Sequence, residues 1–382
     1  MPQVNIEGVC APGFEKLRTL FAENFERHGE VGAAVAAYVD GQPVADLWGG
    51  LARRDERRPW QRDTLVCMMS VNKAMATLCV HLLVQDGKLE LDAPVARYWP
   101  EFAQNGKEHV TVAQVLAHRS GVLYLDALKR GELFDHARAV SAIERQKLTP
   151  EATKGAYHTS TIGIMMAELV RRATGEFIGD FFERRVNQPL GTEYHFRTRD
   201  EDLERTAHLI ERRFNNLRSL LFEEPYFLRM VRCWIALPPL GRLGFNAPLF
   251  LQSGFASGAG VGNARSVARI FSELACASEK SVLLRPEAVR RAAEPSWERM
   301  CWTTGQPTRM ALGFAMNAKG GAYFGPNEHS FGQIGRGGAF GFADPDQRLS
   351  FSYCSNRLSE TGYPDERSQR LVAALYEVAG RA

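Results

Sequence analysis

The chain has 382 residues, of which 45% are hydrophobic, so it can build one large hydrophobic core or two smaller ones. Its formal net charge is only +3, and basic residues are scattered among acidic ones, which argues against an extended surface for nucleic acid. The sequence lacks the roughly 18 consecutive apolar residues of a membrane-spanning helix, and its start lacks the apolar core of a signal peptide. We therefore expect a soluble, cytoplasmic protein that binds neither nucleic acid nor membrane.

Hydrophobic spacing in the first part of the chain predicts a helix, a hairpin and a second helix. Residues 1–25 have the pattern of a short polar lead followed by an amphipathic helix. Residues 31–50 alternate around Asp40-Gly41, a dipeptide that favours a tight turn between antiparallel strands. From Ser70 onward, apolar residues recur at helical spacing until Asp86-Gly87. Ser70 is thus expected at the N-terminus of a helix.

The middle of the chain is dominated by helical patterns, and strand patterns return near its end. Helices are expected at 112–117, at 162–173 with Gly175 as the stop, and at 177–186. The apolar segment 214–250 is interpreted either as core or as a wall or lid over an apolar substrate pocket. A second hairpin is expected from 339–343 and 349–353, and a last helix over 365–378.

Strands at both ends and helices between them predict an α/β fold with an inserted helical region. Residues 1–90 and 245–382 would form an antiparallel sheet flanked by helices. Residues 91–244 would form the mostly helical region, with the active site at the junction.

Cysteine and histidine usage points to neither disulfide nor metal chemistry. The seven cysteines are odd in number, widely spaced and without a Cys-x-x-Cys pair, which is typical of reduced core thiols. Cys67 lies shortly before Ser70 and could line a site there. The nine histidines include no His-Glu-x-x-His pattern. We expect no metal and no cofactor.

The main chemical signal is Ser-x-x-Lys at residues 70–73, which occurs once in the chain. On a helix this spacing places the Lys73 amine one turn from the Ser70 hydroxyl. The amine can accept the serine proton if burial or positive potential lowers its pKa from about 10.4. The free N–H groups of the helix N-terminus would favour negative charge on the serine oxygen. In the structural alternative, Ser70 caps the helix and Lys73 is solvated.

Further segments accompany this motif in order, between about Ala34 and Asn356. They are residues 60–64, 92–95, 98–100, 118–121 (His-Arg-Ser-Gly), 157–159 (Tyr-His-Thr), 331–335 and 341–345. Together with Ser-x-x-Lys they resemble the serine β-lactamase and penicillin-binding protein superfamily, specifically its class C-like branch and the related family VIII carboxylesterases. The resemblance implies a β-lactamase-like fold and catalysis through an acyl-enzyme.

The resemblance assigns catalytic roles residue by residue. Ser70 would be the nucleophile, Lys73 its proton acceptor or the group that sets the local field, and Tyr157 the relay to the leaving group. Either Lys73 or Tyr157 could be the base, and a phenolate would need flanking cations such as Lys73. Residues 333–335 match the family's strand-borne Lys-Thr-Gly, so the main-chain N–H groups of Ser70 and Arg336 would form the oxyanion hole.

The expected substrate-binding residues are Tyr124, Gln333, Gly335 and Arg336. Glycines around position 335 let a substrate approach the strand closely. Tyr124 is expected to reach the pocket by analogy with a tyrosine at a similar place in related esterases. His118 is interpreted as a buried hydrogen-bonding residue rather than a catalyst.

Two departures from the family pattern bear on the substrate. Gln333 replaces the lysine that holds the carboxylate of a β-lactam, and a neutral amide cannot supply that charge, although Arg336 could. Thr159 replaces the asparagine that reads the side-chain amide of a β-lactam. Both changes favour neutral substrates, so we predict a carboxylesterase that acts on short acyl esters of small molecules.

Other functions remain open. The same acyl-enzyme could serve a β-lactamase or D-aminoacyl amidase, or an acyltransferase, and a non-enzymatic relative could keep the fold. An α/β-hydrolase is disfavoured because the chain has no Gly-x-Ser-x-Gly elbow.

Overall fold

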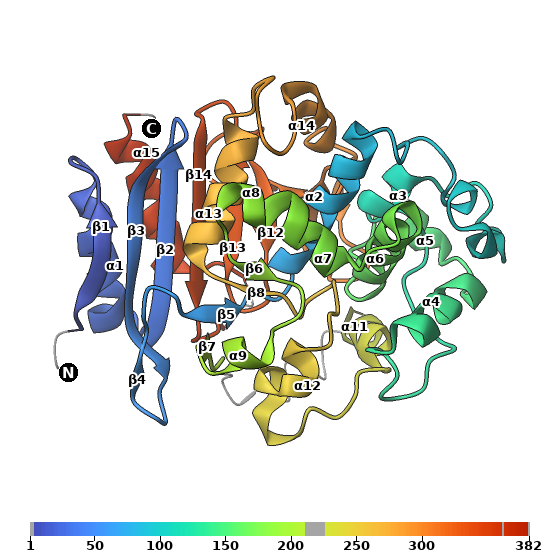
Figure 1. Ribbon diagram of the computed structural model, residues 1–382, viewed down its shortest axis with the longest axis horizontal. Helices are drawn as coiled ribbons and strands as arrows, with labels where there is room; N and C mark the ends of the chain where they lie inside the picture. The colour runs from blue at the N-terminus through green and yellow to red at the C-terminus, as the bar shows by residue number, and fades with distance from the viewer. Residues whose placement is uncertain (1–3, 211–225, 361–362, 381–382) are drawn as a thin grey trace.

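A long antiparallel sheet forms one side of the molecule (Figure 1). The structure is a computed structural model that describes residues 4–210, 226–360 and 363–380. The strand order is β1-β3-β2-β14-β13-β12-β11-β10-β9, and β4 pairs with β3. These strands are β1 (Ile6–Cys10), β2 (Gly32–Val39), β3 (Gln42–Arg53), β4 (Arg58–Pro59), β9 (Trp297–Met300), β10 (Pro307–Met310), β11 (Ala315–Met316), β12 (Phe331–Ile334), β13 (Phe340–Asp344) and β14 (Leu349–Ser355). The two ends of the chain therefore build one sheet.

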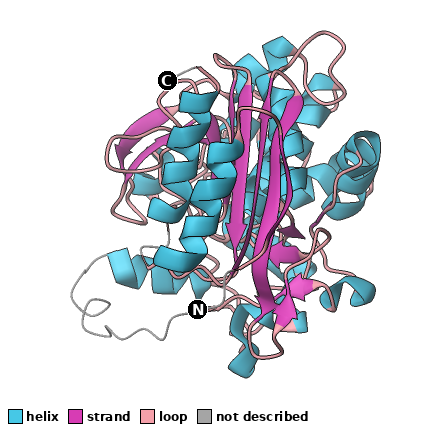
Figure 2. Cartoon of the chain, turned by 90° about the vertical axis from the view of Figure 1, so that its left-hand side faces the viewer, coloured by secondary structure: helices cyan, strands magenta, loops and turns pink. Residues whose placement is uncertain are grey.

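Helices cover both faces of this sheet (Figure 2), and the period-two alternation of its strands explains why. In β2, Val35 faces the cluster formed with α1 (Glu15–Arg27) and α15 (Glu366–Val378). The next residue, Ala36, belongs to the other cluster, which includes α13 (Ala264–Ala275). Because β2 is buried on both faces, it consists mainly of small apolar residues.

The remaining elements are mostly helical, and most of them lie to the right of strands β1, β3 and β2 in Figure 1. The helices are α2 (Val71–Gln85), α3 (Val112–Leu116), α4 (His136–Arg145), α5 (Pro150–Thr153), α6 (Thr161–Thr174), α7 (Ile178–Phe182), α8 (Gln188–Leu190), α9 (Asp200–Leu203), α11 (Tyr226–Trp234), α12 (Pro248–Leu251) and α14 (Pro286–Ala292), with short turns η1 (Val95–Arg97), η2 (Pro100–Ala103), η3 (Glu183–Asn187) and η4 (Gly241–Asn246). A small second sheet has the order β6-β8-β5-β7. Its strands are β5 (Leu65–Cys67), β6 (Tyr194–His195), β7 (Thr206–Ala207) and β8 (Val261–Gly262).

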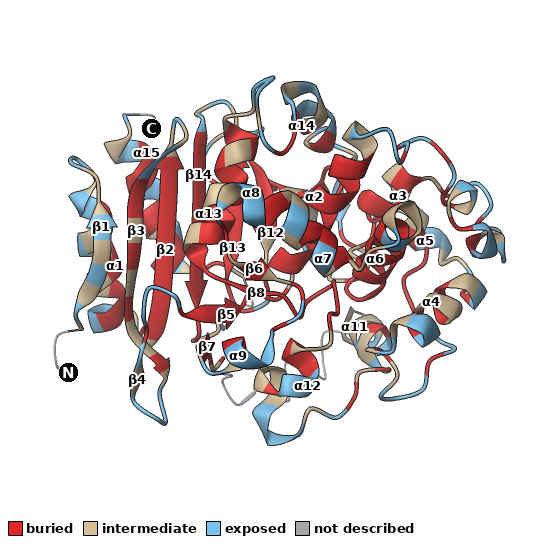
Figure 3. Cartoon of the chain, in the orientation of Figure 1, coloured by how far each residue is buried: buried red, intermediate tan, exposed pale blue. Residues whose placement is uncertain are grey.

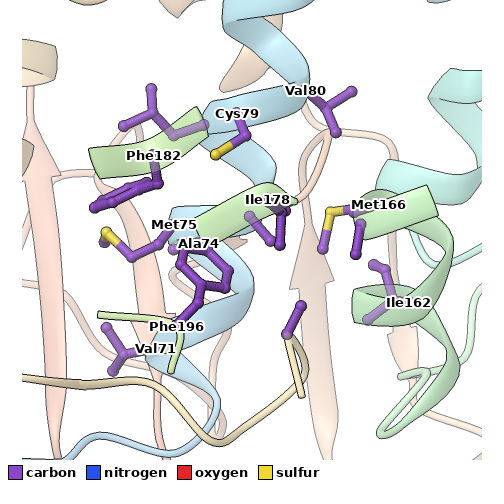
Figure 4. Close-up of a cluster of buried hydrophobic side chains, with 14 of the residues drawn as sticks. Val71, Ala74, Met75, Cys79, Val80, Ile162, Met166, Ile178, Phe182 and Phe196 are labelled. Atoms are coloured by element: carbon purple, nitrogen blue, oxygen red, sulfur yellow. The ribbon is translucent and has the colours of Figure 1, made fainter. Parts of the chain in front are cut away.

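Helix α2 runs through the centre of the molecule, between the sheet and the helical region (Figures 1 and 3). Every residue from Val71 to Leu83 is buried, and most of them are apolar, as expected for a helix in the interior of a large protein. Figure 4 shows Val71, Met75 and Cys79 of α2 among side chains that include Met166 of α6 and Phe182 of α7. A helix held on all sides is a rigid base for the serine at its start.

The structure confirms most of the elements predicted from the sequence. The two hairpins, the helix after Ser70 and the helix that ends at Gly175 are all present, and Gly175 has the left-handed conformation of a helix stop. One expectation is wrong: part of the polar lead, Ile6–Cys10, is an edge strand paired with β3. Of the apolar segment 214–250, residues 214–225, with Leu220, Leu221 and Phe222, lie outside the described residues.

The described part of that apolar segment is neither purely core nor purely surface. Cys233 and Phe250 are buried, whereas Leu228 and Ile235 on and after α11 are 55% and 58% exposed. The buried residues fit the core interpretation, whereas a wall or lid over a substrate pocket stays a prediction.

Candidate active site

Ser70 lies at the junction of β5 and α2, and its hydroxyl does not cap the helix. Ser70 occupies the N-cap position, yet its side chain accepts no hydrogen bond from the first turn. The preceding residue, Met69, has a φ of 50°, a left-handed conformation that is uncommon for a residue with a side chain. The turn is held because the Met68 N–H donates to the Gly260 carbonyl oxygen at 3.0 Å. The serine hydroxyl is left for another partner.

That partner is Lys73, one turn along α2. Its Nζ lies 2.9 Å from Ser70 Oγ and 2.6 Å from the carbonyl oxygen of Ser257. The residue is only 1% exposed, and burial lowers the pKa of its ammonium group to about 7. In the described part of the chain, Lys73 has no carboxylate in ion-pair contact. The solvated surface lysine of the structural alternative is therefore wrong.

Tyr157 enters from the loop before α6 and meets the same hydroxyl. Its phenol accepts a hydrogen bond from Gln333 Nε2 at 3.2 Å, and the Ser70 side chain acts to lower the pKa of the phenol. Lys73 Nζ lies 5.2 Å from the centre of the Tyr157 ring. Burial raises the pKa of the phenol well above its ordinary value, so the group is protonated at neutral pH.

His118 lies against Tyr157 on the side of the helical region. The two rings stack with centroids 4.8 Å apart and planes 24° from parallel. His118 Nδ1 accepts a hydrogen bond from the main-chain N–H of His158 at 2.9 Å, which leaves the ring proton on Nε2. Burial and nearby positive charge hold the pKa of His118 well below its ordinary value. The ring is a neutral support for the phenol, in agreement with the predicted buried hydrogen-bonding role.

The end of β12 approaches the chain just before Ser70. A methyl group on Gly335 would lie 2.2 Å from the Met68 carbonyl oxygen, so a larger residue cannot occupy this position without displacing the backbone. Gly335 N–H donates to the Ala339 carbonyl oxygen at 2.7 Å, which closes the turn into β13. The main chain of Gly335 and Arg336 therefore runs beside the segment that leads into Ser70. The Arg336 side chain is exposed, 5.6 Å from the ring centre of Phe245.

Tyr124 lies apart from this group. Its ring is buried and stacks under the Arg232 guanidinium at 4.0 Å. With Trp302 it lines a cavity of about 580 Å³, and neither Ser70 nor Tyr157 is among the described residues that line it. The structure thus brings together Ser70, Lys73, Tyr157 and Gln333, with Gly335 and Arg336 beside them, and places Tyr124 in a separate hollow.

The other expectations about side-chain chemistry concern thiols and metals. All seven cysteines are free, and burial raises the pKa of Cys67 to about 12, so this thiol is not a reactive group beside Ser70. Within the described ranges, no group of three or more His, Cys, Asp or Glu side chains could hold a metal ion. No helix in those ranges is long and apolar enough to span a membrane.

Sequence reasoning missed three contacts at the site. The carbonyl oxygen of Ser257 holds Lys73, the ring of His118 supports Tyr157, and Cys301 Sγ accepts the Tyr157 main-chain N–H at 3.2 Å. The first is a main-chain group and leaves no signal in the sequence. Of the other two, only His118 stood in a motif, the His-Arg-Ser-Gly segment.

Comparisons with known proteins identify relatives of this chain in sequence and in fold. The Beta-lactamase family profile matches residues 17–376. The protein "Esterase/beta-lactamase LipL" of Mycobacterium tuberculosis is 30% identical over 379 residues, which cover 92% of this chain and 83% of LipL. The crystal structure of a family VIII carboxylesterase is similar with a TM-score of 0.88 and 31% identity, over 98% of this chain and 100% of the other. EstA from Arthrobacter nitroguajacolicus Rue61a gives a TM-score of 0.84 and 29% identity, over 98% and 99%. This chain belongs to the beta-lactamase family.

Proposed function

We propose that the protein is a serine carboxylesterase that hydrolyses short acyl esters through an acyl-enzyme on Ser70. The observation that carries the proposal is the buried contact of 2.9 Å between Ser70 Oγ and an amine whose pKa is lowered to about 7. A lysine buried without a carboxylate is costly for stability, which favours a functional reason for its place. The site would lie at the junction of the sheet region, 1–90 and 245–382, and the helical region, 91–244.

In this proposal Lys73 is the general base. About half of the amine is neutral near pH 7, so it can take the Ser70 proton as Oγ attacks the ester carbonyl carbon. The raised pKa of Tyr157 argues against a phenolate base and for a neutral phenol that donates its proton to the leaving alkoxide. Main-chain N–H groups of Ser70 and Arg336 would stabilise the oxyanion. Water then attacks the acyl-enzyme and restores the serine.

An ester substrate is supported by the neutral character of the site. Gln333 is 3% exposed and carries no charge, so it cannot hold the carboxylate of a β-lactam as a lysine would. An ester also needs less protonation of its leaving group than an amide nitrogen. Gln333, Gly335 and Arg336 would contact the ester itself, and Tyr124 would contact only a substrate group that reaches its separate cavity. The name of the family VIII carboxylesterase agrees with this proposal, and LipL is named both an esterase and a beta-lactamase.

The test is turnover of p-nitrophenyl butyrate by the purified chain. We expect hydrolysis that Ser70→Ala abolishes and that the matched control Ser272→Ala, at a buried serine of α13 outside the site, retains. The kcat/KM should rise with pH through about 7 as Lys73 loses its proton. Full activity of Ser70→Ala would overturn the proposal. Fast nitrocefin turnover with poor ester turnover would favour a β-lactamase instead.

A further inference from the structure

Gln333 lies where it can control the proton on Tyr157. It is a buried residue of β12, paired with Gly341 of β13. Its side-chain nitrogen lies 3.2 Å from the Tyr157 hydroxyl and 3.2 Å from the carbonyl oxygen of Ile334. The amide thus joins the strand's main chain to the phenol of the site.

The orientation of this amide follows from its second contact. A main-chain carbonyl oxygen can only accept a hydrogen bond, so the side-chain group that faces the Ile334 carbonyl is the NH2 group. The same NH2 group faces the Tyr157 oxygen and donates to it. The phenol oxygen therefore accepts from Gln333, and its own proton points to another acceptor. Besides Gln333, the side chain that acts on the phenol is that of Ser70, whose Oγ is the acceptor assigned to this proton.

The hydrogen bond that Lys73 makes on the other side of Ser70 also has a fixed direction. Lys73 Nζ lies 2.6 Å from the carbonyl oxygen of Ser257, which can only accept. A neutral amine donates an N–H to that oxygen and keeps its lone pair for the Ser70 proton, 2.9 Å away. All donors then point the same way, from Gln333 through Tyr157 and Ser70 to Lys73. Neither end requires a charged group.

We propose that Gln333 is a positioning residue that fixes the direction of this relay, so that Tyr157 acts as a proton donor and Lys73 as the acceptor. The inference deepens the proposed function and rests on it. When the bond between Ser70 Oγ and the acyl carbon forms, the serine proton moves to Lys73. When the ester C–O bond breaks, the leaving alkoxide takes the phenol proton, and the Lys73 ammonium returns a proton to the phenolate. The relay thereby accelerates the hydrolysis of esters whose alkoxide must be protonated to leave.

Two substitutions separate this role from simple packing. Gln333→Met keeps a similar volume without the donor, and Gln333→Glu places a carboxylate that accepts the phenol proton and turns it away from Ser70. Each variant is assayed with methyl butyrate, whose alkoxide needs a proton to leave, and with p-nitrophenyl butyrate, whose phenolate does not. The control is Gln306→Met, at an exposed glutamine of the β9–β10 hairpin.

We expect kcat/KM, which reports formation of the acyl-enzyme, to fall about 10- to 100-fold for methyl butyrate in Gln333→Met and further in Gln333→Glu, while kcat/KM for p-nitrophenyl butyrate falls no more than about threefold. The control should behave as wild type with both esters. Equal losses with both esters would mean that Gln333 only packs, and no loss would mean that it has no role; either result overturns the inference. If the wild type shows no Ser70-dependent hydrolysis of either ester, the proposed function itself fails.

Discussion

Replacement of Lys73 by methionine should abolish hydrolysis and stabilise the fold. The buried amine has its pKa lowered from 10.5 to about 7. At about 1.4 kcal/mol per pKa unit, this shift corresponds to a penalty of about 5 kcal/mol on the charged form in the folded protein. Loss of the hydrogen bond to the buried Ser257 carbonyl offsets about 1–3 kcal/mol of the gain. Below about pH 7, where the folded protein bears the whole penalty, a net stabilisation of about 2–4 kcal/mol remains for Lys73→Met.

The sign of the pH dependence follows from proton binding by Lys73. Below about pH 7 the folded and unfolded chains both carry the charge, and the folded protein bears the whole penalty. Between about 7 and 10.5 only the unfolded chain binds this proton, so wild-type stability rises with pH and the advantage of the variant shrinks. The gain should therefore be larger at about pH 6 than at about pH 9.

Equilibrium urea unfolding of wild type and Lys73→Met at both pH values measures this difference. The matched control is Lys88→Met, at an exposed lysine just after α2, which should change stability little at either pH. A Lys73→Met protein that is less stable than wild type by the same amount at both pH values would refute the reasoning, because the amine would then not be desolvated.

Two further predictions concern the supports of the site. His118→Phe keeps a ring against Tyr157 but removes the acceptor of a buried main-chain N–H. We therefore expect a loss of about 1–3 kcal/mol in unfolding free energy and a fall in kcat of less than about tenfold. A larger fall in kcat at unchanged stability would contradict the supporting role. Gly335→Ala places a methyl group 2.2 Å from the Met68 carbonyl oxygen and should lower kcat for p-nitrophenyl butyrate at least about 100-fold with an unchanged circular dichroism spectrum. Gly258→Ala, where the nearest atom would lie 4.0 Å away, is the matched control, and equal activity of the two variants would refute the argument.

The sequence was most informative where the governing interactions are local. Ser70 and Lys73 lie on one helix, so their spacing alone predicts that their side chains meet. The Asp40-Gly41 turn likewise specifies the β2–β3 hairpin, and Gly175 marks a helix end. In each case residues that are close in the chain determine the geometry.

Features that depend on distant segments could not be predicted in this way. The strand Ile6–Cys10 has a weak pattern of its own and forms because it pairs with β3. The choice between Lys73 and Tyr157 as the base depends on burial by several elements, which lowers one pKa and raises the other. The position of Tyr124 beside Arg232 depends on where α11 packs.

The most direct test of the central claim is covalent labelling of the nucleophile. The purified protein is treated with an alkyl p-nitrophenyl phosphonate, and the adduct is located by intact mass and peptide mapping. We predict one adduct per chain, on Ser70, which Ser70→Ala removes and Lys73→Met slows at least about 100-fold. An adduct on another residue, or labelling that does not depend on Lys73, would contradict the account.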